Sequence, residues 1–477
     1  MKRMKKLFAI LMTMAMVMGL GITGFAETKT SATITVNNAS SAATFRYVQV
    51  IEPDRETETG WDFVGSAGAQ FISAFTDDDQ IPSEQDVIKM LIKHEKGEED
   101  YTSEIALALS NCVNNLTLGV MENPQTVTSA GLYVITGLET GYTYGNMAAY
   151  VGFGEVKGDG DIINNEYPSL MDVEIDAKKS PDNTDKTTTE SDHFVQIGDI
   201  VTYNVTAYVP YFNADDTDKT FAVYDDISGA EYYLSGEGSE KKIIMGENPG
   251  TSVEAEWDIS GEKKHDLYID LSSLINDGNT NAGKKITVTY TAKITEVRAD
   301  NTAGSNVGGS YKDSTPVNIY TGNITLKKVG EDSTTTLAGA QFYLTLKDSN
   351  EKLTFTKVDT DDGSNVYQYD PEGKVTTLES DARGLLKVQG LDEGTYHFTE
   401  TKAPEGYYIN EAGKDVTITL DKDVATEEIS VNDSIMNSKL SALPSTGGMG
   451  TTIFTIAGCV IMISAAGLFF ASRRKAN

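Results

Sequence analysis

Alternation between apolar and polar residues is the dominant pattern along this chain. In segments such as 32–36, 44–50, 200–209 and 285–292, apolar residues recur at every second position. A period of two is typical of a β-strand with one buried face. Turns rich in Gly and Asp separate these segments, so the pattern predicts a mainly β protein.

Helical spacing interrupts this pattern in the first part of the chain. Ser83, followed three residues later by Asp86, is typical of a helix start. Apolar positions then recur on one helical face in two successive stretches, Val87, Met90 and Leu91, and then Ile105, Leu109, Cys112 and Leu116. We therefore expect short helices inserted into an otherwise β domain.

Both ends of the chain carry apolar segments next to basic residues. Residues 7–22 are apolar, follow a basic start and precede Gly24-Phe25-Ala26, which predicts a signal peptide cleaved after Ala26. Near the other end, the uncharged run 452–471 precedes Arg473-Arg474-Lys475. This run predicts a membrane helix whose basic end stays in the cytoplasm. The bulk of the protein is therefore expected to be secreted.

Changes in pattern divide the chain into five predicted parts. Three of them are domains of strands and turns, and tandem immunoglobulin-like β-sandwiches are the expected architecture. The parts are a signal peptide (1–26), a first domain with helical insertions (27–171), a middle domain (172–320), a third domain (321–440) and a C-terminal signal (441–477).

Acidic residues outnumber basic ones, 71 to 39, which gives a net charge of −32 at pH 7. The two terminal segments hold basic but no acidic residues, so their removal makes the charge more negative still. Such a surface repels nucleic acid and anionic lipid. We expect neither as a partner.

Cysteine and histidine usage excludes several kinds of site. Once Cys459 is removed with the C-terminal signal, Cys112 is alone and no internal disulfide can form, so any covalent brace must be of another kind. The histidines show no metal-ligand spacing, and neither a serine elbow nor a phosphate loop is present. The acidic stretch 359–363 lacks the calcium-loop pattern, so we expect it to be a solvated turn. We expect no metal, no cofactor and no enzymatic activity.

Three polar residues of the third domain share a strand face with apolar neighbours. Burial favours the neutral forms of a lysine and a glutamate. A neutral amine can attack an amide while a carboxyl carries the protons, which expels ammonia and leaves an internal isopeptide bond. Asn432 is an alternative amide, but its parity is opposite. By period two, the three residues are Lys328 (with Ile324 and Leu326), Glu400 (with Tyr396 and Phe398) and Asn437 (with Ile429, Val431 and Ile435).

The third domain resembles the B-type repeat of collagen-binding adhesins and pilins. The resemblance rests on residues 325–342 and on 396–407, the second of which looks like the glutamate-centred box of that family. It implies that Lys328 is the amine, Asn437 the amide and Glu400 the catalytic acid of an internal isopeptide bond.

The middle domain resembles the isopeptide-forming domain of pilin backbone subunits through residues 196–203 and 286–292. The resemblance implies Asp225 as the acid, which alternation places with Phe221 and Val223, and Asn306 as the amide. Two lysines stay open as the amine. Lys186 fits the family spacing and is preferred, whereas Lys179 shares the parity of apolar neighbours.

The C-terminal signal resembles the sorting signal of Gram-positive surface proteins, in which a sortase cleaves between Thr and Gly. The motif here is Leu443-Pro444-Ser445-Thr446-Gly447, so cleavage is expected between Thr446 and Gly447.

In sortase-assembled pilins the threonine carbonyl is transferred to a lysine of the next subunit. That lysine lies just before the middle domain, which implies Lys178 as the acceptor and Lys179 as the alternative. Asp176-Ala177 stands where the family has Tyr-Pro, and this departure leaves the assignment of the acceptor open.

These features predict a structural backbone subunit of a covalent, wall-anchored pilus that supports adhesion. Its expected partners are sortases, other pilin subunits and peptidoglycan, with a host or community surface ligand as a further candidate. The alternatives are a monomeric wall-anchored or pilus-tip adhesin and, with little support, a wall-anchored enzyme.

Overall fold

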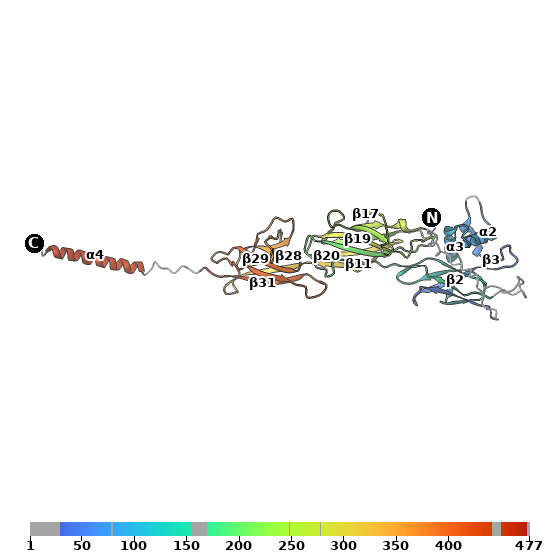
Figure 1. The fold of residues 1–477 in the computed structure, drawn as a ribbon, viewed down its shortest axis with the longest axis horizontal. Helices are drawn as coiled ribbons and strands as arrows, with labels where there is room; N and C mark the ends of the chain where they lie inside the picture. Colours follow the sequence, from blue (N-terminus) through green and yellow to red (C-terminus); the bar gives the residue numbers. More distant parts are fainter. Residues whose placement is uncertain are drawn as a thin grey trace. The chain divides into compact units, whose positions relative to one another are not determined.

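The computed structural model describes residues 29–77, 80–153, 169–247, 249–276, 278–440 and 450–474. Strands dominate these residues, as the alternation predicted (Figure 1). The chain divides into two compact units, one of residues 1–193 and 199–319 and one of residues 194–198 and 320–477. The division into five parts predicted from the sequence stays a prediction.

The first unit begins with two sheets that share an apolar core. The larger has the order β3-β2-β6-β8 with β4 beside β2, and the smaller the order β5-β1-β9. Ile34, Val36, Phe45 and Ile135 lie in the core between them. The strands are β1 (Ala32–Asn37), β2 (Thr44–Pro53), β3 (Trp61–Phe63), β4 (Gly119–Met121), β5 (Gln125–Val127), β6 (Gly131–Leu138), β8 (Met147–Val151) and β9 (Val173–Asp176).

Three helices, α1 (Ala67–Phe75), α2 (Glu84–Glu95) and α3 (Thr102–Asn115), are inserted between β3 and β4. The predicted start of α2 is confirmed, because the Ser83 hydroxyl accepts a hydrogen bond from the Asp86 N–H at 3.2 Å. Apolar side chains of all three helices, Cys112 included, pack in one cluster with residues of β2 and β6. Burial raises the pKa of the Cys112 thiol to about 12, which makes it unreactive.

The same unit continues with two six-stranded sheets, β11-β12-β19-β15-β16 with β14 beside β19, and β17-β18-β13-β20-β21 with β22 beside β20. Alternate residues of β12, from Val201 to Ala207, are buried. The strands are β11 (Asp185–Thr188), β12 (Ile200–Tyr208), β13 (Phe221–Ser228), β14 (Ala230–Tyr232), β15 (Lys241–Met245), β16 (Thr251–Ser252), β17 (Trp257–Asp258), β18 (Leu267–Asp270), β19 (Lys285–Ile294), β20 (Arg298–Val307), β21 (Ser310–Asp313) and β22 (Val317–Tyr320).

A two-stranded ladder joins these two parts of the first unit. It pairs β7 (Tyr142–Tyr144) with β10 (Lys179–Pro181), so that Lys179 lies opposite Tyr144. Its second strand, β10, lies between β9 and β11 in the sequence, where the linking lysine was expected.

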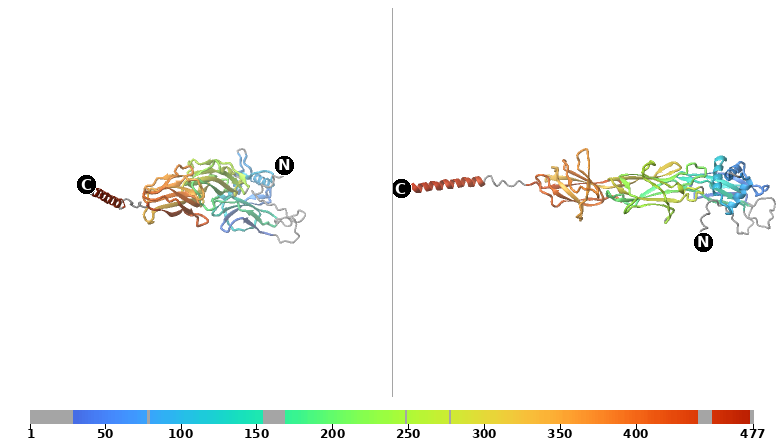
Figure 2. Two further views of the ribbon diagram at one scale, coloured as in Figure 1. Left: turned by 60° about the vertical axis from the view of Figure 1, so that its left-hand side comes forward. Right: turned by 90° about the horizontal axis from the view of Figure 1, so that it is seen from above.

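The second unit is a sandwich of a five-stranded sheet, β25-β26-β28-β23-β31, and a four-stranded sheet, β27-β24-β29-β30. Figure 2 shows its strands in two further views, coloured orange to red. Its first strand, β23, pairs in parallel with its last, β31. The strands are β23 (Gly322–Gly330), β24 (Gln341–Leu346), β25 (Phe355–Val358), β26 (Val366–Tyr369), β27 (Leu378–Glu379), β28 (Leu385–Leu391), β29 (Gly394–Lys402), β30 (Lys414–Ile418) and β31 (Ile429–Asn437).

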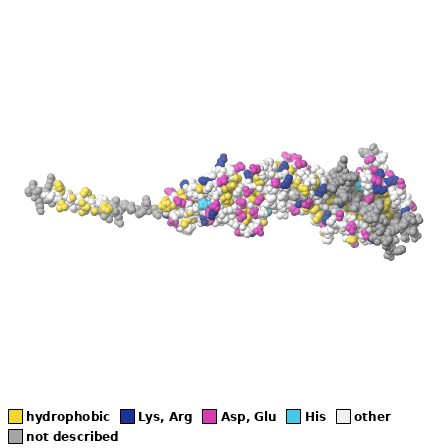
Figure 3. All heavy atoms as spheres, in the orientation of Figure 1, with side chains coloured by type: hydrophobic (Ala, Val, Ile, Leu, Met, Phe, Trp, Pro, Cys, Tyr) yellow, Lys and Arg dark blue, Asp and Glu magenta, His cyan; other side chains and the backbone are white. Residues whose placement is uncertain are grey.

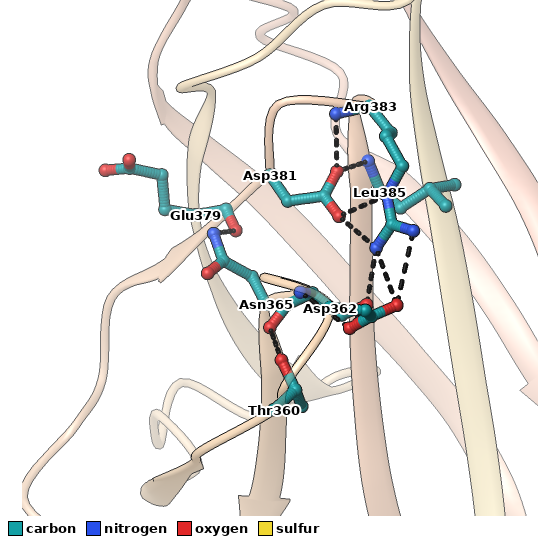
Figure 4. A network of polar contacts seen from close by, with 8 residues as sticks. Thr360, Asp362, Asn365, Glu379, Asp381, Arg383 and Leu385 are labelled. Atoms are coloured by element: carbon teal, nitrogen blue, oxygen red, sulfur yellow. Dashed lines mark hydrogen bonds and ion pairs between the residues drawn. The ribbon is translucent and has the colours of Figure 1, made fainter.

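The acidic turn 359–363 takes part in a polar network (Figure 4). The Arg383 guanidinium lies 3.3 Å from the Asp362 carboxylate and 3.1 Å from that of Asp381. Hydrogen bonds from Ser364, with Arg383 adding to them, lower the pKa of Asp362 to about 2. Asp362 therefore holds the turn to the loop before β28.

Helix α4 (Gly450–Arg474) occupies the region of the predicted membrane helix. Within the described residues, however, no helix is both long and apolar enough to cross a membrane. The expected membrane helix over 452–471 is therefore not supported. The predicted signal peptide and the sorting motif Leu443–Gly447 lie outside the described residues.

Candidate functional site

In the second unit, the three predicted side chains lie together in the core. Lys328 comes from β23, Glu400 from β29 and Asn437 from β31, and the exposed fractions of the whole residues, backbone included, are 1, 5 and 1%. The Lys328 Nζ donates a hydrogen bond to the Asn437 Oδ1 and lies 3.3 Å from the Glu400 Oε1. The Asn437 Nδ2 donates to the same Glu400 oxygen at 2.9 Å. Each group therefore contacts the other two.

Strand pairing explains why these residues meet. The parallel pairing of β23 and β31 places Lys328 beside Ile435 and Gly330 beside Asn437, so amine and amide lie on neighbouring strands of one sheet. Glu400 comes from the facing sheet, where it lies opposite Phe342. Its second oxygen accepts the Asn410 N–H at 2.7 Å, which fixes the carboxylate.

Burial controls the protonation of this amine. Desolvation lowers the pKa of Lys328, although the Glu400 charge acts in the opposite direction. The Nζ also lies 5.7 Å from the centre of the Phe342 ring. A lysine with a lowered pKa, in contact with an amide and a carboxyl, is arranged for attack on the amide carbon.

In the first unit, the structure brings Lys186 and Asp225 together. Lys186 lies on β11 and Asp225 on β13, so the two sheets face each other at this point. The Lys186 Nζ donates to the Asp225 Oδ2 and, at 2.6 Å, to the Tyr290 hydroxyl. The Tyr232 hydroxyl donates to the other Asp225 oxygen at 2.8 Å. Between the two lysines left open, the contact with Asp225 favours Lys186.

Both members of this pair are shifted toward their neutral forms. Burial lowers the pKa of Lys186 to about 8 and raises that of Asp225. A neutral amine next to a protonated carboxyl is the state from which attack on an amide proceeds.

The expected amide of this site, Asn306, is not brought to the lysine. Asn306 lies opposite Ala222, whereas Asp225 lies opposite Ala303, so Asn306 has the parity of the other sheet face. Its Nδ2 donates instead to the Tyr268 hydroxyl, at 3.5 Å.

Asn301 occupies the position that Asn306 was expected to fill. It is fully buried, and its Nδ2 donates at 3.0 Å to the same Tyr290 hydroxyl that Lys186 contacts. Its Oδ1, like that of Asn306, has no hydrogen-bond partner among the described residues. Sequence reasoning missed Asn301, although it shares its odd parity with the buried Ala299, Ala303 and Ser305.

The two candidate linking lysines differ in their surroundings. The Lys179 Nζ lies 2.8 Å from the Glu139 Oε2, in an ion pair that is largely buried. Lys178, its neighbour, is half-buried, and its ammonium makes no hydrogen bond or ion pair with the residues that the structure describes. Burial lowers the pKa of Lys178 to about 8. Sequence reasoning gave no role to Glu139.

The part of the chain that the structure describes contains no group of three or more His, Cys, Asp or Glu side chains that could hold a metal ion. Acidic side chains are spread over the face seen in Figure 3, in line with the net charge.

Two family models match the C-terminal third of the chain. Residues 322–434 match the prealbumin-like fold domain of SpaA, and residues 435–477 match the LPXTG cell wall anchor motif. The first match covers the sandwich that holds Lys328 and Glu400. The second covers the sorting motif and places the protein outside the cell, attached to the wall.

Two curated proteins resemble the chain over longer stretches. The fimbrial subunit type 1 of Actinomyces viscosus is 29% identical over 181 residues, which are 34% of either protein. The chain thus spans about a third of that relative. The trypsin-resistant surface T6 protein of Streptococcus pyogenes serotype M6 is 21% identical over 453 residues, which cover 73% of this chain and 79% of the relative.

Solved structures of pilins also align with the chain. The T6 backbone pilin of S. pyogenes has a TM-score of 0.48 and 14% identity, with 83% of this chain and 81% of that chain covered. The major pilin SpaD of Corynebacterium diphtheriae has a TM-score of 0.44 and 16% identity, with 87% and 98% covered. The two family matches and the two curated relatives make the chain similar to fimbrial and pilin subunits, and they support a sortase-assembled, wall-anchored major pilin.

Proposed function

We propose that this protein is a backbone subunit of a covalent pilus, in which Thr446 of one copy is joined to Lys178 of the next. The observation that carries the proposal is that one chain holds both reactants of such a linkage. The anchor match supplies the acyl donor. Lys178, with a lowered pKa and no ionic partner among the described residues, supplies the amine.

The linkage is a transpeptidation with a simple balance. A sortase thiol attacks the Thr446 carbonyl, the bond to Gly447 breaks, and the new amine of Gly447 leaves with the C-terminal fragment. The neutral Lys178 Nζ then attacks the thioester, which forms an amide and releases the thiol. Attack by an amine of peptidoglycan instead of Lys178 ends the polymer on the wall.

We propose further that each unit closes one internal isopeptide bond. The lysine Nζ attacks the amide carbon of the asparagine, a carboxyl passes protons to the leaving nitrogen, and one ammonia departs. The geometry supports Lys328, Asn437 and Glu400 in the second unit. In the first unit it supports Lys186, Asp225 and Asn301, with Asn301 replacing Asn306.

These bonds suit a protein that carries tension. The bond in the second unit would join β23, its first strand, to β31, its last. A pull on the two ends of this domain then acts on a covalent bridge, and the strands between are shielded from the load. This is the role of a structural shaft, and it requires no substrate and no turnover.

The test is an immunoblot of enzymatically released cell wall under denaturing and reducing conditions. A ladder of high-mass bands is expected in the wild type, with collapse in Lys178→Ala and persistence in the matched Lys179→Ala variant. Thr446→Ala should abolish both the ladder and wall attachment. A single band of monomer mass in the wild type would contradict polymerisation and favour a solitary wall-anchored or tip adhesin.

A further inference from the structure

Lys178 and Lys179 are both candidate acceptors for the proposed intersubunit bond, so the structure around them must determine which lysine reacts. Lys178 and Lys179 follow β9 after Ala177, and Lys179 begins β10. Both residues carry the same ε-amine on the same flexible four-carbon side chain. Any preference must therefore come from the groups around each ammonium.

Glu139 holds the Lys179 side chain through a closed set of contacts. Its Oε2 lies 2.8 Å from the Lys179 Nζ and accepts the Tyr144 hydroxyl at 2.6 Å, while its Oε1 accepts the Ser40 hydroxyl at 2.6 Å. The Lys179 Nζ also lies 4.1 Å from the centre of the Tyr142 ring. Only 7% of the Glu139 side chain and 16% of the Lys179 side chain are exposed.

This arrangement holds the Lys179 amine against a charged carboxylate. The three donors lower the pKa of Glu139 to about 2, with Lys179 the largest cause, so the carboxylate stays charged at any physiological pH. An ammonium in such a pair has no free electron pair, and freeing it would leave a buried charge without its partner. It is therefore a poor nucleophile.

Lys178 lies in a different environment, next to Gly145. Its carbonyl accepts the Gly145 N–H at 2.9 Å. A Cβ added to Gly145 would lie 2.9 Å from the Tyr211 ring and 3.6 Å from the Lys178 Cβ, so the lysine stem packs closely here. No carboxylate among the described residues holds its ammonium, and its burial favours the neutral amine.

We propose that Glu139 is a specificity-determining residue, which directs intersubunit linkage to Lys178 by holding Lys179 in an ion pair. This inference rests on the proposed function for its biological meaning. Its chemical content, the unequal reactivity of two neighbouring amines, can be measured without any polymer.

The first experiment measures amine reactivity on the monomer. The mature protein is released from the wall of cells that lack the polymerising sortase and is treated with limiting N-hydroxysuccinimidyl acetate at pH 8. Cleavage after Glu174 and Glu190 leaves Lys178 and Lys179 in one peptide with Lys186, which carries the Asn301 peptide if the proposed internal bond has formed, and fragmentation then separates the acetylation of Lys178 and Lys179. Lys178 is expected to react about tenfold faster or more than Lys179 in the wild type.

Glu139→Gln removes the charge at nearly constant volume, and it should raise Lys179 labelling severalfold while Lys178 labelling stays constant. Asp182→Asn is the matched control, since Asp182 follows β10 and pairs with Lys312, and it should leave the ratio unchanged. Equal labelling in the wild type, or an unchanged ratio in Glu139→Gln, would overturn the proposal. If Glu139→Gln does not fold, Ser40→Ala with Tyr144→Phe, which loosens the carboxylate, should produce the same change at smaller size.

The second experiment maps the linkage itself in assembled pili. Wild-type polymer should carry the branched peptide at Lys178 alone, and Glu139→Gln polymer should carry it at both lysines. Linkage confined to Lys178 in Glu139→Gln would refute the role of Glu139. A wild type that forms no polymer would refute the proposed function instead, and the labelling ratio would still decide whether Glu139 controls Lys179.

Discussion

The Nζ of Lys328 lies 3.3 Å from the Oε1 of Glu400 in a core where neither side chain is more than 1% exposed. For an ion pair without access to water, the free energy lost by desolvating both charges is commonly larger than the free energy gained from their attraction. Asn437 hydrogen-bonds both partners. Conversion of this trio into an amide bond removes the buried charge and adds a covalent link.

The intact mass of the mature protein should therefore fall short of its sequence mass by two ammonia molecules. Glu400→Ala should restore one of them, because without the carboxyl no group carries protons to the leaving nitrogen. Asp225→Ala should restore the other. Mass spectrometry of the purified protein decides the matter, and a full sequence mass in the wild type would refute both bonds.

Replacement of each asparagine of β20 in turn tests which one supplies the amide. The sequence resemblance implied Asn306, whereas the structure favours Asn301. Asn301→Ala should restore one ammonia to the mass, because Asn301 shares the Tyr290 hydroxyl with Lys186. Asn306→Ala should leave the mass deficit at two, because its amide contacts Tyr268. The opposite result would return the amide role to Asn306.

Loss of the bond in the second unit should lower thermal stability markedly. The proposed bond would close a loop between positions 109 residues apart, and by analogy with a disulfide a loop of about 100 residues is stabilised by about 4.7 kcal/mol. Calorimetry of Asn437→Ala should show a fall in the free energy of unfolding of at least this size, because the variant also loses buried contacts. The Asn432→Ala control lies on the same strand at the opposite parity and should change little.

Labelling of Lys178 should depend on pH with a midpoint near 8. Burial lowers its pKa to about 8, so the neutral fraction should approach its maximum above pH 9, earlier than for an exposed lysine with an ordinary pKa near 10.4. Since the folded state binds fewer protons than the unfolded state between these values, the contribution of Lys178 to folding stability rises with pH across that window. A labelling midpoint near 10 would contradict the burial of this amine.

The carboxylate of Glu139 should make the ladder of β7 and β10 sensitive to acid. Its pKa is lowered to about 2 from an ordinary value of 4.5. The stabilisation is therefore fully present above about pH 4.5 and is lost as the pH falls toward 2. The difference in unfolding free energy between wild type and Glu139→Gln, measured in denaturant, should shrink over that range; a constant difference would show that the pair is not ionic.

The sequence by itself determined the features that depend on local periodicity. Period-two alternation predicted the strands, and it placed Lys328, Glu400 and Asn437 on inward faces, because the side a residue points to follows from its position within its own strand. A change to helical spacing located α2 and α3, and the Ser83 cap depends on residues three apart. The mainly β fold with helical insertions was confirmed for the same reason.

Only the tertiary structure decided which inward-facing groups meet. Asn301 and Asn306 differ by five residues and hence in parity, but the choice between them required the register of β20 against β13, which the sequence does not state. The ion pair of Lys179 with Glu139 joins residues 40 positions apart through β7 and β10. Such contacts arise from sheet register and from the facing of sheets, which are set by the packing of the whole domain and not by the pattern of any one strand.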